Sequence, residues 1–388
     1  MNKRILLLTP VPSHPATAGN RARVFKLASL IRALGHDLHF AHVQWEMGDD
    51  EAMQACWGAA HYHVLPYERP ERFLFRVRRK VGNTLKSELR YQLGVDDWYD
   101  GAIDAWLRQL HARYAFDAVL VEYVFLSRAL CNFPDDVIRL IDTHDVMANR
   151  HRLYTRNGEH YNWFSTTRRG ERKGLRRADV VIAIQDLENR YFADLTGRHT
   201  VTIGHAVDLH PISSPGTHAA NLLFIGSANQ ANLDAIEFFL KEAFPKVLAK
   251  CANARVLIAG PVTRKLDDYW SDSVISLGVP DELVSCYTQA DVVINPVRVG
   301  TGLKIKNIEA LGFGKALVTT SIGAEGMEDA VGRAFLVAND ADGLSAAVIA
   351  LLSDSARRTA IEKAGLAYAT EWNQRQVNVL KSVLRDRA

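Results

Sequence analysis

Short, continuous apolar runs alternate with longer amphipathic stretches along almost the whole chain. Residues 4–9 (RILLLT) form the first run, and a helical pattern over 21–34 follows it. Gly35 fits the position after that helix, because glycine tolerates a positive φ. Runs that are apolar on both faces and separated by helices predict parallel sheets covered by helices on each side. The expected strands are 4–9, 117–121, 137–141, 179–184, 201–203, 221–225, 255–259, 274–277, 291–295, 316–319 and 334–337, and further helices are expected over 232–249, 304–312 and 367–387.

The periodicity stops over residues 204–220, which are rich in Pro, Ser, Gly and His. Such a stretch is typical of a linker, and 388 residues are more than one ordinary domain needs. The sequence therefore predicts an α/β protein of two Rossmann-like domains, each a doubly wound parallel sheet. We expect domains at 1–205 and 206–369, with a last helix at about 370–388 packed back on the first. Ligands are expected at the carboxyl ends of the strands, in a cleft between the domains.

Composition narrows the classes of protein further. With 48% hydrophobic and 23% charged residues, the chain is neither disordered nor fibrous. Its apolar runs fall short of the roughly 18–20 residues of a membrane span. The start resembles a signal peptide, but its apolar stretch is short, so we expect a buried strand and a cytoplasmic protein. Four widely spaced cysteines favour reduced thiols over a zinc site or disulfides.

Positive charge is concentrated in the first half of the chain. Residues 1–200 hold 29 Lys/Arg and 24 Asp/Glu (+5), whereas residues 201–388 hold 18 and 20 (−2). The cluster from Arg69 to Arg90 mixes cations with Phe73, Phe75 and Val77. It suits an anionic membrane surface, at the inner face of the membrane, but a solvated helix face stays open as the alternative. The cluster over 150–177 suits a pyrophosphate-bearing acceptor or simple exposure. With no nucleic-acid module visible, we expect no nucleic-acid partner.

The most informative stretch is NPVRVGTGLKIKNIEAL, residues 295–311. A strand ends at Asn295, a glycine-containing loop follows, and a helix begins near Leu303. Loop glycines let a ligand approach the backbone, and the first N–H groups of a helix attract anions, so the stretch suits a diphosphate. Arg298 and Lys306 add positive charge. On this pattern alone, a solvated helix start is an equal alternative.

This stretch resembles the carboxy-terminal motif of the retaining glycosyltransferase family 4, also called group 1 glycosyltransferases, which has the GT-B fold. Several ordered segments share the resemblance and together cover nearly the whole chain. They are Gly19, DTHD at 142–145, IGHAVD at 203–208, NLLFIGS at 221–227 with NLDAI at 232–236, LIAG at 257–260, GVP at 278–280, YTQADVVINP at 287–296, GKALVTT at 314–320 and GAEG at 323–326.

The resemblance implies a retaining enzyme that moves a sugar from a nucleotide-diphosphate sugar to a glycan or lipid-linked acceptor, as in bacterial polysaccharide synthesis. It implies no cofactor and no metal, because a helix dipole and cations can stabilise the leaving phosphate. The implied catalytic residues are His144, Lys306 and Arg298. The implied donor-binding residues are Gly226, Ser227, Gly260, Thr301, Gly302, Leu303, Lys304 and Glu309, and the implied acceptor-binding residues are Gly19, Asn20 and Arg21.

The chain departs from the family pattern at two places. The usual signature carries two glutamates, and the first of them would fall on Thr301. Gly302, Lys306 and Glu309 fit the form that lacks this glutamate. The usual Arg and Lys of the first strand–helix unit of the donor domain are also missing, so Arg298 and Lys306 are the expected substitutes.

His144 follows an expected strand and so should lie at its carboxyl end. The family's histidine at this place contacts the donor sugar, whereas a structural role in the loop is the alternative. Three other functions of the same fold or chemistry also stay open: a sugar-nucleotide epimerase, a phosphorylase-like enzyme, and a non-catalytic subunit that binds sugar nucleotides.

Overall fold

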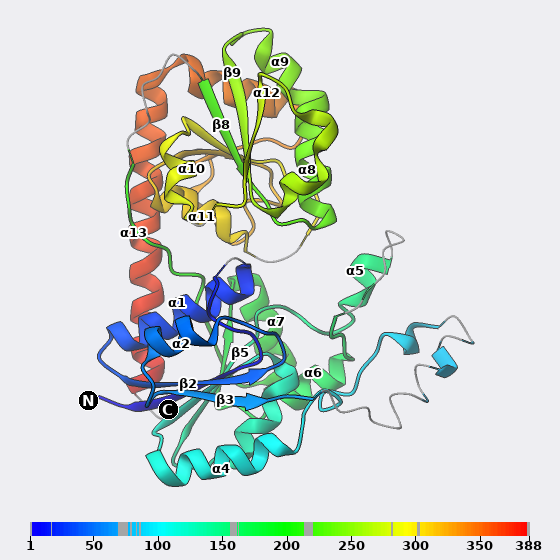
Figure 1. The fold of residues 1–388 in the computed structure, drawn as a ribbon, viewed down its shortest axis with the longest axis vertical. Coiled ribbons are helices and arrows are strands. Elements are labelled where there is room, and N and C mark those ends of the chain that lie inside the picture. Colours follow the sequence, from blue (N-terminus) through cyan, green and yellow to red (C-terminus); the bar gives the residue numbers. More distant parts are fainter. Residues whose placement is uncertain are drawn as a thin grey trace. The chain divides into compact units, whose positions relative to one another are not determined.

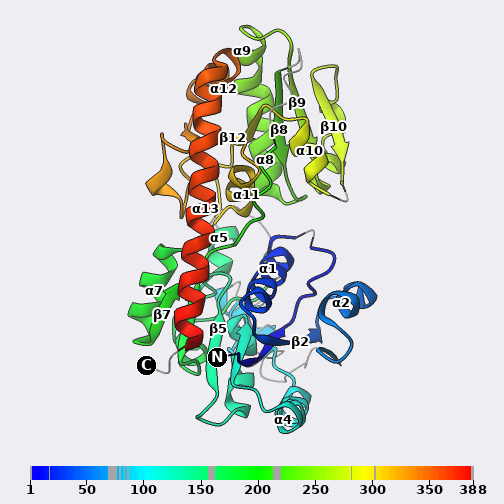
Figure 2. The same cartoon turned by 90° about the vertical axis from the view of Figure 1, so that its left-hand side faces the viewer.

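The computed structural model describes residues 2–16, 18–68, 77, 80–82, 84, 87–155, 161, 163–212, 220–280, 282–300 and 303–385. By its internal contacts the chain forms two compact units. The amino-terminal unit contains Met1–Ala206 with Gln376–Ala388, and the carboxy-terminal unit contains Val207–Arg375. Each unit is a parallel sheet flanked by helices, as Figure 1 shows. Helix α13 contributes its last residues to the amino-terminal unit (Figure 2).

The amino-terminal unit has a seven-stranded sheet in the order β3-β2-β1-β4-β5-β6-β7, and all its pairs are parallel. Side chains from both faces of the central strands are buried, as the continuous apolar runs predict. Its strands are β1 (Arg4–Thr9), β2 (Asp37–Gln44), β3 (Tyr62–Pro66), β4 (Ala118–Glu122), β5 (Ile138–Asp142), β6 (Val180–Ala183) and β7 (His199–Thr202).

The helices of this unit supply the apolar layers of its core. One face of α1, through Val24, Leu27 and Ile31, packs in the same cluster as Leu380 and Leu384 near the end of α13. The helices are α1 (Gly19–Ala33), α2 (Asp50–Trp57), α4 (Ala102–Tyr114), α5 (His151–Thr155), α6 (Arg168–Leu175) and α7 (Asp186–Thr196), with short 3₁₀ segments η1 (Glu88–Arg90) and η2 (Val124–Asn132).

The carboxy-terminal unit has a six-stranded parallel sheet in the order β10-β9-β8-β11-β12-β13. Its strands are β8 (Ala220–Ile225), β9 (Ala254–Ala259), β10 (Val274–Gly278), β11 (Val292–Asn295), β12 (Ala316–Thr319) and β13 (Leu336–Val337). Its helices are α8 (Gln230–Phe238), the π turn η3 (Phe239–Ala243), α9 (Phe244–Leu248), α10 (Val284–Thr288), α11 (Ile305–Gly312), α12 (Ala341–Ser353) and the first part of α13 (Ser355–Arg385), with 3₁₀ segments η4 (Pro261–Lys265), η5 (Asp267–Tyr269) and η6 (Glu328–Ala330).

Two expected helices differ from the observed ones. The single helix expected over 232–249 is interrupted by the π turn η3, which ends just before Pro245. Proline has no N–H to donate and its ring crowds the preceding turn, so the hydrogen-bond pattern shifts there. The last helix begins at Ser355 instead of residue 367, directly after α12 ends.

Two strands, β2 and β3, were not among the expected runs. Strand β2 reads DLHFAHVQ, and its histidines interrupt the apolar pattern. His39 and His42 are nevertheless buried, at 2% and 0% exposure. Counting histidine as a polar residue therefore hides a strand that lies inside the sheet.

Two expected features fall mostly or partly outside the described residues. Most of the cationic positions of the cluster from Arg69 to Arg90 lie outside them, and so does the linker segment 213–219. Among the described residues, no helix combines the length and the hydrophobicity needed to cross a membrane.

Candidate active site

The carboxyl ends of two central strands of the amino-terminal unit carry buried charged groups. Glu122 ends β4, Asp142 ends β5, and the two residues are paired across the strands. His144 lies two residues beyond Asp142. The exposed fractions are 0% for Glu122 and Asp142 and 7% for His144, so this cluster is shielded from bulk water.

An ion pair anchors the cluster. Arg23, buried on α1, donates to both carboxylate oxygens of Asp142, with Nε–Oδ2 and Nη2–Oδ1 distances of 2.6 Å, and donates a third bond to the carbonyl of Ile203 at 2.9 Å. Burial alone would raise the pKa of Asp142, but the charge of Arg23 holds that pKa below its ordinary value. A bidentate pair of this kind fixes the planes of both groups.

His144 is held in an unusual backbone conformation beside this ion pair. Its φ is +60°, in the left-handed region that side-chain-bearing residues seldom adopt. Its Nε2 lies 2.5 Å from Glu122 Oε2, and its ring stacks on Tyr123 with 4.0 Å between centroids. Burial lowers the pKa of His144 to about 4, so the ring is neutral near pH 7.

Glu122 is shifted in the opposite direction. Burial, and then the charge of Asp142, raise the pKa of Glu122 well above its ordinary value. Burial thus favours the neutral form of both Glu122 and His144, which are joined by the short hydrogen bond.

The oxygens of Glu122 and Asp142 and a ring nitrogen of His144 lie close enough together to hold a metal ion. Arg23 already supplies the positive charge there, 2.6 Å from Asp142. Because Arg23 is bonded to both carboxylate oxygens of Asp142, a cation at this place would have to displace that ion pair.

The expected acceptor residues lie at the start of α1. Gly19 is the first residue of the helix, and the side chain of Asn20 is hydrogen-bonded to Tyr123, the residue that stacks on His144. Arg21 turns to Glu46 instead, with an Nη2–Oε2 distance of 3.1 Å. The structure thus links Asn20 to the His144 cluster through Tyr123, whereas the charged end of Arg21 binds elsewhere.

In the carboxy-terminal unit, the expected donor residues gather at the carboxyl ends of β8, β9 and β11. Gly260, at a φ of +94°, lies so close to Gly226 that a Cβ on it would come within 2.4 Å of the Gly226 carbonyl oxygen. Only glycine allows the two loops to pack backbone to backbone here. The hydroxyl of Ser227 accepts a hydrogen bond from Asn232 at 3.0 Å, which ties the loop to α8.

Lys306, on the first turn of α11, is the central residue of this site. Its Nζ donates to the Ile225 carbonyl at 3.2 Å and to Asn232 Oδ1 at 3.0 Å, and it lies 4.5 Å from the centre of the Phe224 ring. These contacts are with neutral groups. Burial, with a smaller effect of Lys304, lowers the pKa of Lys306 to about 7. The half-buried ammonium is thus one that a bound anion would stabilise.

Other expected cations lie around the same loop. Arg298 is exposed and stacks on Phe238, with 4.0 Å from its guanidinium carbon to the ring centre. Lys304 Nζ lies 3.4 Å from Glu325 Oε2. Leu303 is buried, Glu309 is half-buried on α11, and Thr301 and Gly302 lie outside the described residues.

A buried amide network that the sequence did not predict holds α11 against the strand ends. Asn295 donates to Asn307 Oδ1 at 2.8 Å, and Asn307 donates to the Gly323 carbonyl at 2.7 Å. These bonds fix the start of the helix that carries Lys306. Arg23, Glu122 and Asn232 were missed as site residues as well, because each gains its partners, far away in sequence or on another element, only on folding.

Comparison with known proteins supports an assignment of the fold and of one domain. Residues 219–354 match the family model of group 1 glycosyl transferases. An uncharacterized 44.6 kDa protein in the cps region of Klebsiella pneumoniae is 28% identical over 149 residues, which are 35% of this chain and 38% of that protein. The chain thus matches well under half of the length of that relative.

Solved structures resemble the whole chain. A glycosyltransferase from Rickettsia africae has a TM-score of 0.69 at 12% identity and full coverage of both chains. Anabaena HepE in complex with UDP and glucose has a TM-score of 0.63 at 14% identity, covering 97% of this chain and 99% of that one. The pneumococcal O-GlcNAc transferase GtfA, in complex with UDP and GlcNAc, has 0.68 at 11% identity and full coverage of both. The fold is therefore the GT-B fold, as expected, and residues 219–354 match a group 1 glycosyltransferase domain.

Glu188 is a further buried acid near the His144 cluster, and its protonation tests how strongly burial shifts the pKa values in this region. Burial, and then the charge of Asp145, raise the pKa of Glu188 to about 8. The folded protein holds this proton up to about pH 8 while the unfolded chain releases it above roughly pH 4.5, so wild-type stability falls as pH rises between these values. In Glu188→Gln this loss should disappear, and its free energy of unfolding relative to wild type should rise by up to about 1.4 kcal/mol per pH unit.

Urea unfolding of Glu188→Gln and wild type from about pH 5 to about pH 8 measures this difference. Leu187→Ala is the control. Leu187 is the residue before Glu188, its side chain is 64% exposed, and it does not titrate. A difference between Glu188→Gln and wild type that stays constant with pH would show that Glu188 is ionised in the folded protein.

Proposed function

We propose that this protein is a glycosyltransferase that moves a sugar from a nucleotide-diphosphate sugar to a hydroxyl group of a glycan or lipid-linked acceptor. The observation that carries the proposal is the half-buried ammonium of Lys306, held among neutral oxygens at the carboxyl ends of the strands of a parallel sheet. It lies within the segment that matches the group 1 glycosyltransferase family. A diphosphate is the kind of ligand that such a cation binds.

The position of Lys306 supports its role as a substitute for the missing donor-site cations. Its Nζ reaches the end of β8 and the side chain of Asn232 on α8, which belong to the first strand–helix unit of the domain. Arg298 stacks on Phe238 of the same α8. Two cations carried by the β11–α11 segment thus reach the unit from which the family's usual cations are absent. We propose that both bind the diphosphate, with Lys304, Glu309 and the loop at Thr301 and Gly302 binding the rest of the donor.

In the proposed reaction, the bond between the anomeric carbon and the diphosphate oxygen breaks, and its electron pair leaves with the diphosphate. The acceptor oxygen forms the new bond to the anomeric carbon on the same face, so the configuration is retained, and its proton is released. Fixed cations and helix N–H groups stabilise the charge that develops on the leaving group. We propose that the reaction needs no metal and no cofactor.

We propose that His144 contacts the donor sugar near the reacting carbon. A neutral imidazole suits that place, because it can hydrogen-bond to sugar hydroxyls without opposing the positive charge that develops on the sugar. Its support by Glu122 and Tyr123 agrees with a positioned functional group. Asn20, linked to Tyr123, is the acceptor-side residue that the geometry supports best.

The nucleotide is proposed to be UDP. The structures of HepE and GtfA, which share the fold, were solved with UDP. A thermal-shift series with UDP, GDP and their sugars tests this choice, because a ligand that binds only the folded protein raises its melting temperature. An epimerase or a non-catalytic subunit is not favoured, and nucleoside diphosphate released in step with a glycosylated product distinguishes transfer from both.

Replacing Lys306 should disable the donor site without unfolding the protein. Lys306→Met keeps the apolar length of the side chain but removes its charge, so sugar transfer from the best donor should fall by about 100-fold or more. Arg298→Ala, which removes an exposed cation, should lower transfer by about 10-fold. The rates come from chromatographic measurement of the released nucleoside diphosphate.

Lys241→Met is the matched control for Lys306→Met. Lys241 is an exposed lysine of the same unit and pairs with Glu237 one helical turn away, so its loss should leave transfer unchanged. Wild-type turnover in folded Lys306→Met would contradict the proposed phosphate role.

We also propose that the enzyme acts in the cytoplasm, as a peripheral protein at the inner face of the membrane where its acceptor is held. The support is the basic cluster from Arg69 to Arg90, in which the described residues Val77, Val81 and Leu89 are about 40% exposed. Basic residues near an anionic surface contribute roughly 1 kcal/mol each, and salt weakens them.

Vesicle flotation tests this location. Wild type should float with anionic vesicles at low salt and be released by high salt, and replacing Arg76, Arg78, Arg79 and Lys80 with glutamine should reduce flotation. Equal flotation with anionic and neutral vesicles would rule out the electrostatic attachment, and a soluble acceptor would then be preferred.

A further inference from the structure

Asp37, His39, His61 and His63 form a cluster near the amino-terminal ends of strands β2 and β3, away from the strand ends at which His144 lies. Asp37 is the first residue of β2 and is paired with Arg4, the first residue of β1. His61 directly precedes β3, and its carbonyl accepts a hydrogen bond from the Phe40 N–H. Because the strands are parallel, these residues lie where the strands begin, whereas His144 follows a strand end.

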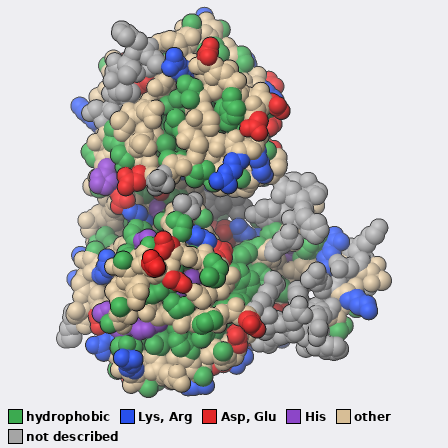
Figure 3. All heavy atoms as spheres, viewed as in Figure 1, with side chains coloured by type: hydrophobic (Ala, Val, Ile, Leu, Met, Phe, Trp, Pro, Cys, Tyr) green, Lys and Arg blue, Asp and Glu red, His purple; other side chains and the backbone are tan. Residues whose placement is uncertain are grey.

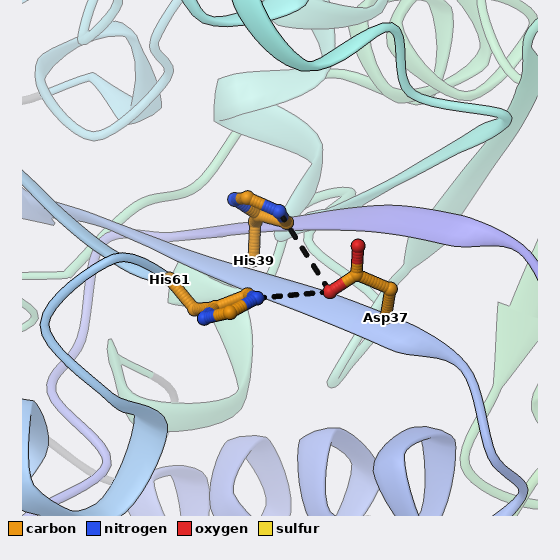
Figure 4. A group of neighbouring side chains, drawn as sticks. All are labelled: Asp37, His39 and His61. Atoms are coloured by element: carbon orange, nitrogen blue, oxygen red, sulfur yellow. Dashed lines mark hydrogen bonds and ion pairs between the residues drawn. The ribbon is translucent and has the colours of Figure 1, made fainter.

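The side chains of this cluster converge on one carboxylate oxygen. His61 Nε2 lies 2.9 Å from Asp37 Oδ1, and His39 Nε2 lies 3.9 Å from the same oxygen. Figure 4 shows both rings directed at this carboxylate from β2 and from the residue before β3. Histidine side chains also reach the face of the amino-terminal unit that Figure 3 shows.

We propose that Asp37, His39 and His61 bind one divalent cation of the zinc class. Two imidazole nitrogens and a carboxylate oxygen are donors that Zn²⁺ prefers, and three protein ligands leave a fourth position for water. Bonds of about 2.0–2.1 Å in a tetrahedral site place donor atoms roughly 3.3 Å apart. The two oxygen–nitrogen separations of 2.9 and 3.9 Å lie on either side of this value, and all three ligand atoms lie within 4.8 Å of one another.

Neighbouring side chains hold the three proposed ligands in position, as the second layer of residues around a metal site does. His39 Nδ1 lies 2.9 Å from His63 Nε2, a bond that orients the ring and directs Nε2 toward Asp37. Arg4 donates to the other carboxylate oxygen, Oδ2, at 2.9 Å and leaves Oδ1 toward the histidines. Tyr114 and Phe116 lie against the His39 ring, with centroids 4.4 and 5.2 Å away.

The exposure of the ligands also suits metal binding. His39 is buried, whereas the side chains of His61 and Asp37 are 40% and 31% exposed, so an ion and a water molecule can enter from solvent.

Such an ion would fasten an edge of the sheet. Strand β3 ends the sheet formed by the described residues, and its five residues pair with β2. A metal held by His61 and by two residues of β2 would join the start of β3 to its neighbour. The cation would therefore stabilise the fold and take no part in sugar transfer.

Equilibrium dialysis with Zn²⁺ and a thermal scan of the full chain, without a histidine tag, test the proposal. Wild type should bind one Zn²⁺ per chain, and Zn²⁺ should raise its melting temperature by about 2–4 °C or more. His61→Asn and His39→Gln should each weaken binding by at least about 10-fold, and His63→Gln, which alters only the outer partner, should weaken it by roughly 10–100-fold.

His199→Asn is the matched control, because His199 is an exposed histidine on β7 at the other edge of the same sheet. It should bind Zn²⁺ as the wild type does. Co²⁺ bound at the site should give no thiolate charge-transfer absorption, which separates the site from the free cysteines. Absence of binding at about 100 μM free Zn²⁺, or binding unchanged in both His61→Asn and His39→Gln, would overturn the proposal.

Discussion

A lysine ammonium half-buried among neutral groups is the feature on which the proposed donor site of the carboxy-terminal unit depends. Removing a charge from water is costly unless an opposite charge or several hydrogen bonds compensate. Lys306 has two oxygen partners and an aromatic ring, and these stabilise its cationic form only in part. The lowered pKa of Lys306 shows that these partners do not fully replace the water that the ammonium has lost. A bound diphosphate would supply the missing negative charge.

The rest of that unit holds this lysine in place. Asn307 ties α11 to β11 and to the Gly323 carbonyl, and the close contact of Gly226 and Gly260 brings the β8 and β9 loops together. These residues are uncharged, and they fix the positions of α11 and of the neighbouring loops. A site for a charged ligand needs such support, because cations that moved away on binding would stabilise the transition state less.

The amino-terminal unit also contains buried ionisable groups, but here they lie next to one another. The charge of Arg23 lowers the pKa of Asp142, whereas burial raises the pKa of Glu122. Burial also lowers the pKa of His144, whose ring is held by its neighbours while its backbone is strained. Strain that persists in a buried loop beside a strand end is typical of a functional position.

Much of the fold was predictable, since continuous apolar runs mark strands buried on both faces, and all eleven expected runs coincide with observed strands to within a few residues. Strand β2 was missed because histidines interrupt its run, and the short edge strand β3 was missed with it. The glycines and lysines of the 295–311 stretch predict an anion site, and this stays a prediction. The neutral partners of Lys306 were not visible in the sequence, since Ile225 and Asn232 lie more than 70 positions away from it. The ion pair of Arg23 with Asp142 spans 119 positions and leaves no local signal either.

If Lys306 binds the diphosphate of the donor, proton uptake on binding of UDP measures that contact most directly. At about pH 8, well over half of a lysine with a pKa of about 7 is neutral, and an adjacent diphosphate would raise that pKa and draw in a proton. Calorimetric titration with UDP in two buffers of different ionisation enthalpy gives the number of protons taken up. The account predicts that wild type takes up close to one proton more than Lys306→Met. Equal proton uptake by the two proteins, with UDP bound by both, would contradict it.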